Sequence, residues 1–337
     1  MIDFRSDTVT LPTPAMLAFM QSAPLGDDVF GEDPSINALE AKTAGIFGME
    51  AGLFCPSGTM TNQLAIKTHT QAGDEVICEE LSHIYQYEGG GIASNSGSSV
   101  KLLRGNRGRI TAEQVLAAIN PDDVHKPISK LVSLENTCNR GGGACYDFSE
   151  IEAIQKVAKS NGLGLHLDGA RIFNAIVHKN EDPKQYGKVF DSISICLSKG
   201  LGAPVGSVLL GSAPFIKKAR RWRKVFGGGM RQAGSLAAAG IYALDNHIER
   251  LKEDHSKALK INDALLKKDF VKEIFEVETN IVIAHIEGKY NATQLAATLK
   301  EKNISVIAMT PQLIRFVVHL DITNEMLATT IETIEKL

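Results

Sequence analysis

Short apolar runs rich in β-branched residues alternate with amphipathic stretches through the middle of the chain. Turn-forming residues bound these runs, and a short apolar run bounded in this way is typical of a buried strand. The predicted strands are Leu53–Cys55, Glu75–Cys78, Val100–Leu103, Lys130–Glu135, Leu163–Asp168, Ser192–Ser198 and Val205–Leu210. Strands separated by helices indicate an α/β domain with a mainly parallel sheet.

Helices fit between several of these strands. Between residues 36 and 47 the apolar side chains share one helical face, and Gly48 is placed to end that helix. Two further pairs have the spacing of a capping box, which marks a helix N-terminus. These pairs are Thr111 with Gln114 and Ser149 with Glu152.

The pattern changes in the C-terminal part of the chain. Charge-rich helical segments predominate there, with strands expected at Asn280–His285 and Arg315–His319 and a last helix from about Asn324. A chain of 337 residues is long enough for roughly two domains. We therefore expect a large domain over residues 1–245 and a smaller α+β domain over 246–337.

Composition narrows the range of partners. The net charge is only −3, so nothing in the charge balance favours a nucleic acid or a membrane surface. No apolar run approaches the roughly 20 residues of a membrane span, and the N-terminus lacks a secretory pattern. The five cysteines form no CxxC pair, so we expect a reducing, cytoplasmic compartment.

Several common catalytic signatures are missing from the chain. It has no GxGxxG, no GxxxxGK[ST], no HExxH and no GxSxG. The sequence therefore gives little support for a dinucleotide site, a P-loop, a zinc peptidase or an α/β-hydrolase site.

The first positive signal follows the strand that ends at Cys55. The chain turns at Pro56 and Gly58, and a helix is expected from about Met60, directly after Ser57, Gly58 and Thr59. Small residues and free backbone N–H groups at a helix N-terminus form an anion site, for which phosphate is a natural ligand. The alternative is an ordinary N-cap by Ser57 or Thr59.

Two charged residues lie at the carboxyl ends of successive predicted strands. Asp168 ends one apolar run, and Lys199 follows the next, 31 residues later. Ligands bind at the carboxyl ends of strands in open α/β sheets, so the two side chains could share one rim. There are two alternatives. Arg171 could form an ion pair with Asp168, and the Lys199 amine could extend into solvent.

Together these signals match the needs of pyridoxal 5′-phosphate (PLP). PLP has a phosphate, an aldehyde that forms a Schiff base with a lysine, and a ring nitrogen that a carboxylate keeps protonated. A glycine-rich stretch further on, over residues 227–229, lies between Lys224 and Arg231. Such a loop could bring either cation to a phosphate, including that of a neighbouring subunit.

The chain resembles the low-specificity L-threonine aldolases, fold-type I PLP enzymes of the aspartate aminotransferase superfamily. The motifs that carry the resemblance are FRSDTVT (4–10), GDDVFGEDP (26–34), PSGTMTN (56–62), SLENT (133–137), HLDGARIFNA (166–175), CLSKGLGAPVGS (196–207) and GGGMRQ (227–232). The resemblance implies cleavage of L-threonine, L-allo-threonine and other β-hydroxy-α-amino acids to glycine and an aldehyde. It also implies a homotetramer with its active site at a subunit interface.

The resemblance assigns roles residue by residue. Lys199 matches the lysine of the Schiff base, and Asp168 matches the carboxylate on the ring nitrogen. The matches for the phosphate are Gly58, Thr59 and Arg231. Arg171 matches an arginine near both the ring hydroxyl of the cofactor and the substrate carboxylate, and Ser6 and Arg315 match the other groups that hold that carboxylate. His83 matches a histidine stacked on the ring and His125 a histidine near the substrate β-carbon, and either could be the general base.

The chain departs from its relatives at two positions. Phe30 stands where relatives often carry Tyr, and Cys138 where they can carry His. Two other functions stay open at this stage. One is a β-eliminating PLP lyase with the same cofactor site, and the other is a non-catalytic protein on the same fold in which Lys199 is idle.

Overall fold

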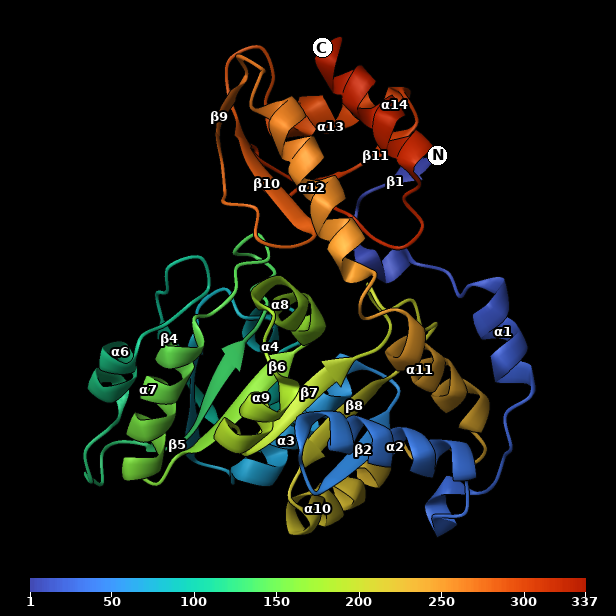
Figure 1. The fold of residues 1–337 in the computed structure, drawn as a ribbon. Helices are drawn as coiled ribbons and strands as arrows, with labels where there is room; N and C mark the ends of the chain where they lie inside the picture. The colour runs from blue at the N-terminus through green and yellow to red at the C-terminus, as the bar shows by residue number, and fades with distance from the viewer.

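A seven-stranded sheet forms the body of the protein in the computed structural model, which describes residues 1–337 (Figure 1). The strand order is β2-β8-β7-β6-β5-β3-β4. β8 alone runs in the direction opposite to the other six strands, so the prediction of a mainly parallel sheet is confirmed. The strands are β2 (Ala51–Cys55), β3 (Asp74–Glu79), β4 (Ser99–Leu103), β5 (Ile128–Glu135), β6 (Gly164–Gly169), β7 (Ser192–Cys196) and β8 (Ser207–Gly211).

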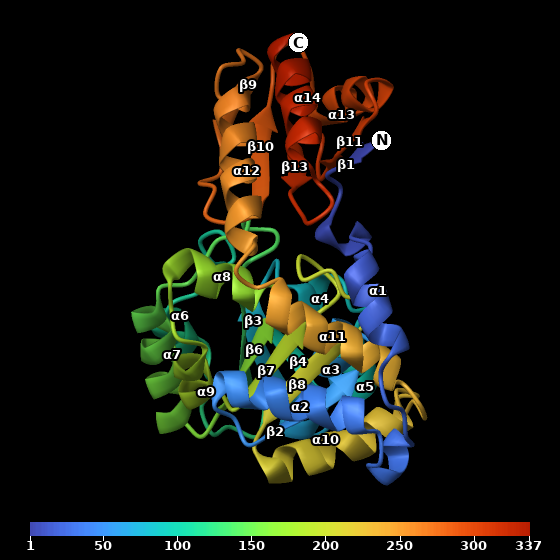
Figure 2. The same ribbon diagram turned by 45° about the vertical axis from the view of Figure 1, so that its right-hand side comes forward.

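Helices cover both faces of this sheet (Figures 1 and 2). Because successive side chains of a strand point to opposite faces, Leu53 and Cys55 pack with α3 and α10, whereas Phe54 belongs to the main core with α2. The helices of this part are α1 (Pro14–Gln21), α2 (Pro34–Phe47), α3 (Gly58–His69), α4 (His83–Gln86), α5 (Gly91–Ser96), α6 (Ala112–Ala118), α7 (Phe148–Ser160), α8 (Ile172–Lys179), α9 (Pro183–Val189), α10 (Ala213–Val225) and α11 (Gly234–Asn246).

The local signals for helix ends were only partly right. Gly48 ends α2 in a left-handed conformation, and Thr111 with Gln114 forms a complete capping box on α6. The box predicted for Ser149 and Glu152 is wrong, because the N-cap residue is Asp147, two residues before Ser149, and α7 begins at Phe148. Ser149 lies inside the first turn, where its hydroxyl cannot act as a cap.

The C-terminal part is a four-stranded antiparallel sheet, ordered β12-β13-β10-β9, with helices packed against it. The predicted strands near Asn280 and Arg315 and the helix from Asn324 are all present. Its elements are α12 (Leu251–Leu265), β9 (Val271–Ile274), β10 (Ile281–Ile286), α13 (Ala292–Glu301), β11 (Ile304–Ser305), β12 (Ile307–Ala308), β13 (Leu313–Val317) and α14 (Asn324–Glu335). No helix of the chain combines the length and the apolar composition that crossing a membrane requires.

The N-terminus joins this C-terminal part, which the sequence did not predict (Figure 2). Strand β1 (Ile2–Asp3) pairs in parallel with β11, and the buried Phe4 ring lies 6.0 Å from the Phe316 ring. The chain then crosses to the large sheet, where Thr10 donates a hydrogen bond to the Lys199 carbonyl. Residues 5–10 therefore connect the two parts at the carboxyl edge of the large sheet.

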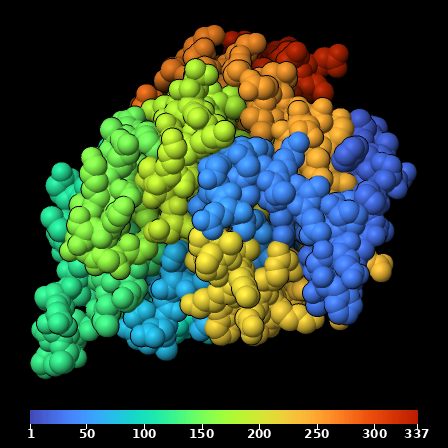
Figure 3. Space-filling view, turned by 60° about the horizontal axis from the view of Figure 1, so that its bottom comes forward, coloured from blue at the N-terminus to red at the C-terminus, as the bar shows by residue number.

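With the bottom of Figure 1 turned forward, α2 in blue and α10 in yellow form the middle of the visible surface (Figure 3). The segment between α6 and β5, in teal and green, projects from the lower left of this view. Its Val124 is 98% exposed, so this segment makes little contact with the rest of its own chain.

Replacing Phe4 by Ala tests the anchorage of the N-terminus. A fully buried aromatic ring is removed, so we expect the free energy of unfolding in urea to fall by about 3–5 kcal/mol. The exposed Leu259 on α12 serves as the control, where Leu259→Ala should cost less than about 1 kcal/mol. Equal losses in the two variants would show that Phe4 is not part of the core.

Candidate active site

The carboxyl ends of β6 and β7 place Asp168 and Lys199 at one edge of the sheet. The two strands are parallel neighbours with Asp168 opposite Ser194, and Lys199 follows the end of β7. Lys199 lines a cleft of about 390 Å³ between the large sheet and the C-terminal part. The cleft is lined by Ser6, Thr8, His83, Tyr87, Asn139, Arg140, Arg171, Lys199, Ile307, Ala308, Met309 and Arg315.

Asp168 has no cationic partner although it is only 2% exposed. Its carboxylate accepts hydrogen bonds from the Asn62 amide at 2.9 Å and from the Ala170 N–H at 3.2 Å. The alternative in which Arg171 pairs with Asp168 is therefore wrong. A buried carboxylate without a counterion is costly, so this position favours a ligand that brings a positive charge.

The N-terminus of α3 lies beside this edge. The Ser57 hydroxyl accepts from the Met60 N–H at 3.1 Å, so the ordinary N-cap is present. The N–H groups of Gly58 and Thr59 belong to the first turn and have no partner inside the helix. The buried Ser207 hydroxyl also lacks a partner, and it lies 3.6 Å from where a Cβ on Gly58 would be. These free donors fit a phosphate group.

His83 begins α4 and is held by two carboxylates that the sequence analysis missed. Its Nδ1 lies 3.0 Å from Glu88, and its backbone N–H donates to Glu135 at 2.7 Å. Burial opposes the charged ring, but the hydrogen bond to Glu88 and the charge of Asp168 outweigh it and raise the pKa of His83. Glu135 lies opposite Asp168 in the sheet, and burial together with that charge raises its pKa to about 7.

One side-chain atom each from His83, Glu88 and Asp168 lies within 4.8 Å of the others, a grouping that could hold a metal ion. The Asn62 amide nitrogen donates to both carboxylates, at 2.8 Å to Glu88 and 2.9 Å to Asp168. These two hydrogen bonds account for the grouping, because one amide brings the two carboxylates together.

Two arginines form the positive wall of the cleft. The Arg171 guanidinium makes two bonds of 2.7 Å to the buried Asp7, and Arg315 donates to Asn139 at 2.9 Å. The Arg315 Nε has no partner, and burial beside the charge of Arg171 lowers the pKa of Arg315 to about 10. Because Ser6 lines the same wall, the three residues predicted to hold a carboxylate lie together.

Three predicted residues lie outside this cleft within one chain. Arg231 is exposed and pairs with Asp27 at 2.9 Å, and Lys224 is near the end of α10. His125 lies in the projecting segment between α6 and β5, where its side chain is 86% exposed and bonds only Asp123. None of the three lines the cleft that contains Lys199.

Comparison with known proteins places the chain in a class of enzymes. Residues 3–289 match the beta-eliminating lyase family, and the chain belongs to this family of lyases. These are PLP enzymes, so the predicted cofactor is confirmed, as is the α/β fold of fold-type I PLP enzymes.

Within that class the chain belongs to the low-specificity L-threonine aldolase family. It is 43% identical to the low specificity L-threonine aldolase of Escherichia coli strain K12 over 97% of this chain and 96% of the relative. A probable low-specificity L-threonine aldolase of Arabidopsis thaliana is 42% identical over 96% and 93%. The structure of Leishmania major threonine aldolase shares the fold, with a TM-score of 0.87 at 20% identity over 100% and 99% of the two chains.

The Asp7→Asn variant tests the anchor of Arg171. Arg171 and Lys199 outweigh burial and lower the pKa of Asp7 from 3.8 to about 2. The charged carboxylate therefore stabilises the fold fully above pH 3.8, and this contribution is lost as the pH falls through about 2. Removing the charge leaves Arg171 buried and unpaired, so we expect a loss of about 3 kcal/mol at pH 7.

Urea unfolding at pH 7 measures this loss. Asp3→Asn removes the partner of the exposed Arg5 and is the matched control, with an expected loss below about 1 kcal/mol. A loss for Asp7→Asn no larger than that of the control would contradict the proposed anchor.

Proposed function

We propose that this chain uses PLP to cleave L-threonine, L-allo-threonine and other β-hydroxy-α-amino acids to glycine and an aldehyde. The observation that carries the proposal is one cleft that contains Lys199 and two arginines, directly beside the unpaired carboxylate of Asp168. The relatives at 42–43% identity are named L-threonine aldolases, and the family description supports a lyase.

Each part of the cofactor has a candidate partner. Lys199 supplies the amine, Asp168 the carboxylate for the ring nitrogen, and the turn at Ser57, Gly58 and Thr59 the donors for the phosphate. Bound PLP supplies an electron sink for the pair released when a bond at the substrate α-carbon breaks. Asp168 maintains that sink because an ionised carboxylate keeps the ring nitrogen protonated.

The carboxylate of the amino acid fits between Arg171, Arg315 and Ser6. Two nitrogens of Arg171 donate hydrogen bonds to Asp7, and these bonds fix the plane of the Arg171 guanidinium. Arg315 reaches the cleft from β13 and has a buried Nε without a partner. Two fixed cations orient the substrate, and orientation decides which bond at the α-carbon is broken.

The proton of the substrate hydroxyl needs an acceptor. His83 lines the cleft, and Glu88 holds its Nδ1, so Nε2 faces the remaining space as donor or acceptor. Within one chain this position favours His83 over His125. His125 is the candidate for a substrate contact from a second subunit, because its segment projects from its own chain.

The chain acts as a homo-oligomer, a tetramer with the active site at a subunit interface. Large apolar side chains gather on the surface of the N-terminal segment, as expected for a surface that another subunit covers. These side chains are Leu11, Leu17, Phe19, Leu25, Val29 and Phe30. Assembly would also give roles to Lys224, Arg231 and His125, which do not reach the cleft of their own chain.

Two further proposals concern the whole chain. We divide it into a large domain over residues 1–245, which includes the N-terminal arm, and a small domain over 246–337. Separate apolar cores in the large sheet and in the C-terminal part support the division. The cytoplasm is the proposed compartment, and the five free, buried cysteines are consistent with reducing conditions.

Lys199→Ala tests the covalent role of the amine. The variant should fold, since the side chain is only partly buried, but turnover of L-threonine should fall by at least about a thousandfold. Borohydride should attach the cofactor to the wild-type protein and not to the variant. Product analysis of the wild type decides the reaction, because glycine and acetaldehyde support the aldolase, whereas 2-oxobutanoate and ammonia would establish β-elimination.

Arg231→Ala tests the shared site. Loss of a phosphate-binding cation should weaken PLP binding by about tenfold or more, measured by titrating the apoprotein. Mixing this variant with Lys199→Ala chains should restore part of the activity, because some sites then receive Lys199 from one chain and Arg231 from the other. Lys217→Ala on α10 is the control for removal of a surface cation, and no recovery in mixtures would mean that each subunit forms its own site.

A further inference from the structure

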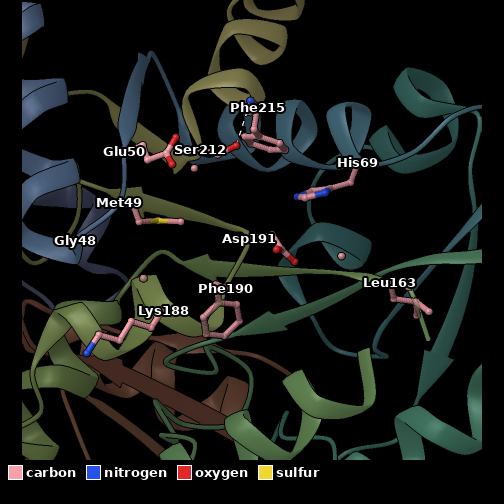
Figure 4. Close-up of a pocket in the computed structure, with 14 residues that line it drawn as sticks. Gly48, Met49, Glu50, His69, Leu163, Lys188, Phe190, Asp191, Ser212 and Phe215 are labelled. Atoms are coloured by element: carbon pink, nitrogen blue, oxygen red, sulfur yellow. Dashed lines mark hydrogen bonds between the residues drawn. The ribbon is translucent and has the colours of Figure 1, made fainter. Parts of the chain in front are cut away.

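A second and larger cavity lies at the opposite edge of the large sheet (Figure 4). Its volume is about 660 Å³, and its lining includes Gly164 at the start of β6 and Asp191 just before β7. His69, the last residue of α3, extends into the wall of this cavity, with its ring 4.7 Å from that of Phe215. The proposed function does not use this side chain.

A continuous series of hydrogen bonds connects His69 to Asp168 through the interior of the protein. The His69 Nε2 lies 2.8 Å from the Ser192 hydroxyl, which lies 2.9 Å from the His166 Nδ1. The His166 Nε2 lies 3.1 Å from the Asn62 Oδ1, and the Asn62 Nδ2 lies 2.9 Å from Asp168. Ser192, His166 and Asn62 are at most 1% exposed.

The direction of every bond in this series follows from its end at Asp168. The Asn62 nitrogen faces two carboxylates, Glu88 and Asp168, so its Oδ1 must face His166 and accept from Nε2–H. The neutral His166 ring then accepts at Nδ1 from the Ser192 hydroxyl. That hydroxyl has used its proton, so it accepts from His69 Nε2–H. All four bonds donate toward Asp168.

Burial keeps both imidazoles neutral. Burial lowers the pKa of His69 to about 3, assisted by His166 and by Lys218 on α10. Burial also lowers the pKa of His166 to about 4, although the charge of Asp168 opposes this effect. The other titratable groups that face Asp168 are Glu135 on β5, His83 on α4 and Glu88 after α4.

We propose that His69, Ser192, His166 and Asn62 are positioning residues that together stabilise the Asp168 carboxylate and orient it toward the cofactor ring. This inference rests on the proposed function. Hydrogen bonds that donate in one direction polarise one another, so each donor strengthens the next and the last acts on the carboxylate. The amide of Asn62 cannot exchange its proton as an imidazole does, so the chain supplies hydrogen bonds to Asp168 but delivers no proton to it.

Ser192→Ala tests the chain at its centre. The variant removes one oxygen atom and breaks two of the four hydrogen bonds. Ser194→Ala is the matched control, because Ser194 is buried two residues further along β7 and loses only a bond to Thr61. Both variants should lose similar stability, about 1 kcal/mol.

The distinguishing measurement is the affinity of each apoprotein for PLP across the acidic pH range. A weaker last donor stabilises the Asp168 carboxylate less, so the loss of PLP affinity on acidification should begin at higher pH in Ser192→Ala. We expect its midpoint to rise by about half a pH unit and that of Ser194→Ala to stay with the wild type. Equal midpoints in the two variants would overturn the inference, whereas a wild-type protein that binds no PLP would overturn the proposed function instead.

Nitrogen-15 NMR of histidine-labelled wild-type holoenzyme provides a second test that needs no variant. His69 and His166 should both be neutral Nε2–H tautomers from pH 5 to pH 8, about one unit or more above their lowered pKa values of about 3 and about 4. A proton on the Nδ1 of His166 would reverse its bond with Ser192, and a charged ring at either position would contradict the neutral chain. Either result would overturn the inference.

Discussion

The burial of Asp168 without a cation is the constraint on which the site depends. An isolated carboxylate in a protein interior costs several kcal/mol, and only hydrogen bonds or a counterion offset that cost. Asn62 and the Ala170 N–H supply two hydrogen bonds, but no arginine or lysine bonds this carboxylate. Arg171, the nearest cation in the sequence, pairs with Asp7 instead. The remaining charge matches a protonated ring nitrogen, and PLP provides that group.

Negative charge is concentrated further by Glu88 and Glu135. Burial and the nearby charge of Asp168 raise the pKa of Glu135 to about 7, so this carboxyl group is only partly ionised near neutral pH. The same field raises the pKa of His83. A histidine that gains a proton readily and lies beside the cleft is suited to take one from a substrate hydroxyl. The carboxylates therefore serve both the cofactor and the candidate base.

The sequence predicted those features that depend on neighbours along the chain. Asp168 and Lys199 follow apolar runs, and the parallel arrangement of those runs was enough to bring the two residues to one edge. Partners from distant segments could not be predicted. Asp7 and Arg171 are 164 residues apart, and Asn62 and Asp168 are 106 apart. The capping box at Ser149 failed for a related reason, since Asp147 and Glu150, two residues earlier, have the same spacing.

The first ten residues link the two parts of the protein at the cleft, which both parts form. Phe4 is packed in the C-terminal core, Asp7 holds Arg171 at the large sheet, and Thr10 bonds the Lys199 carbonyl. Arg315 reaches the same cleft from the C-terminal sheet and bonds Asn139 of the large part. A carboxylate between Arg171 and Arg315 would therefore attract both parts at once. Substrate binding and the relative position of the two parts are then coupled through Arg171 and Arg315, and through the N-terminal segment that the buried Phe4 ring anchors in the C-terminal core.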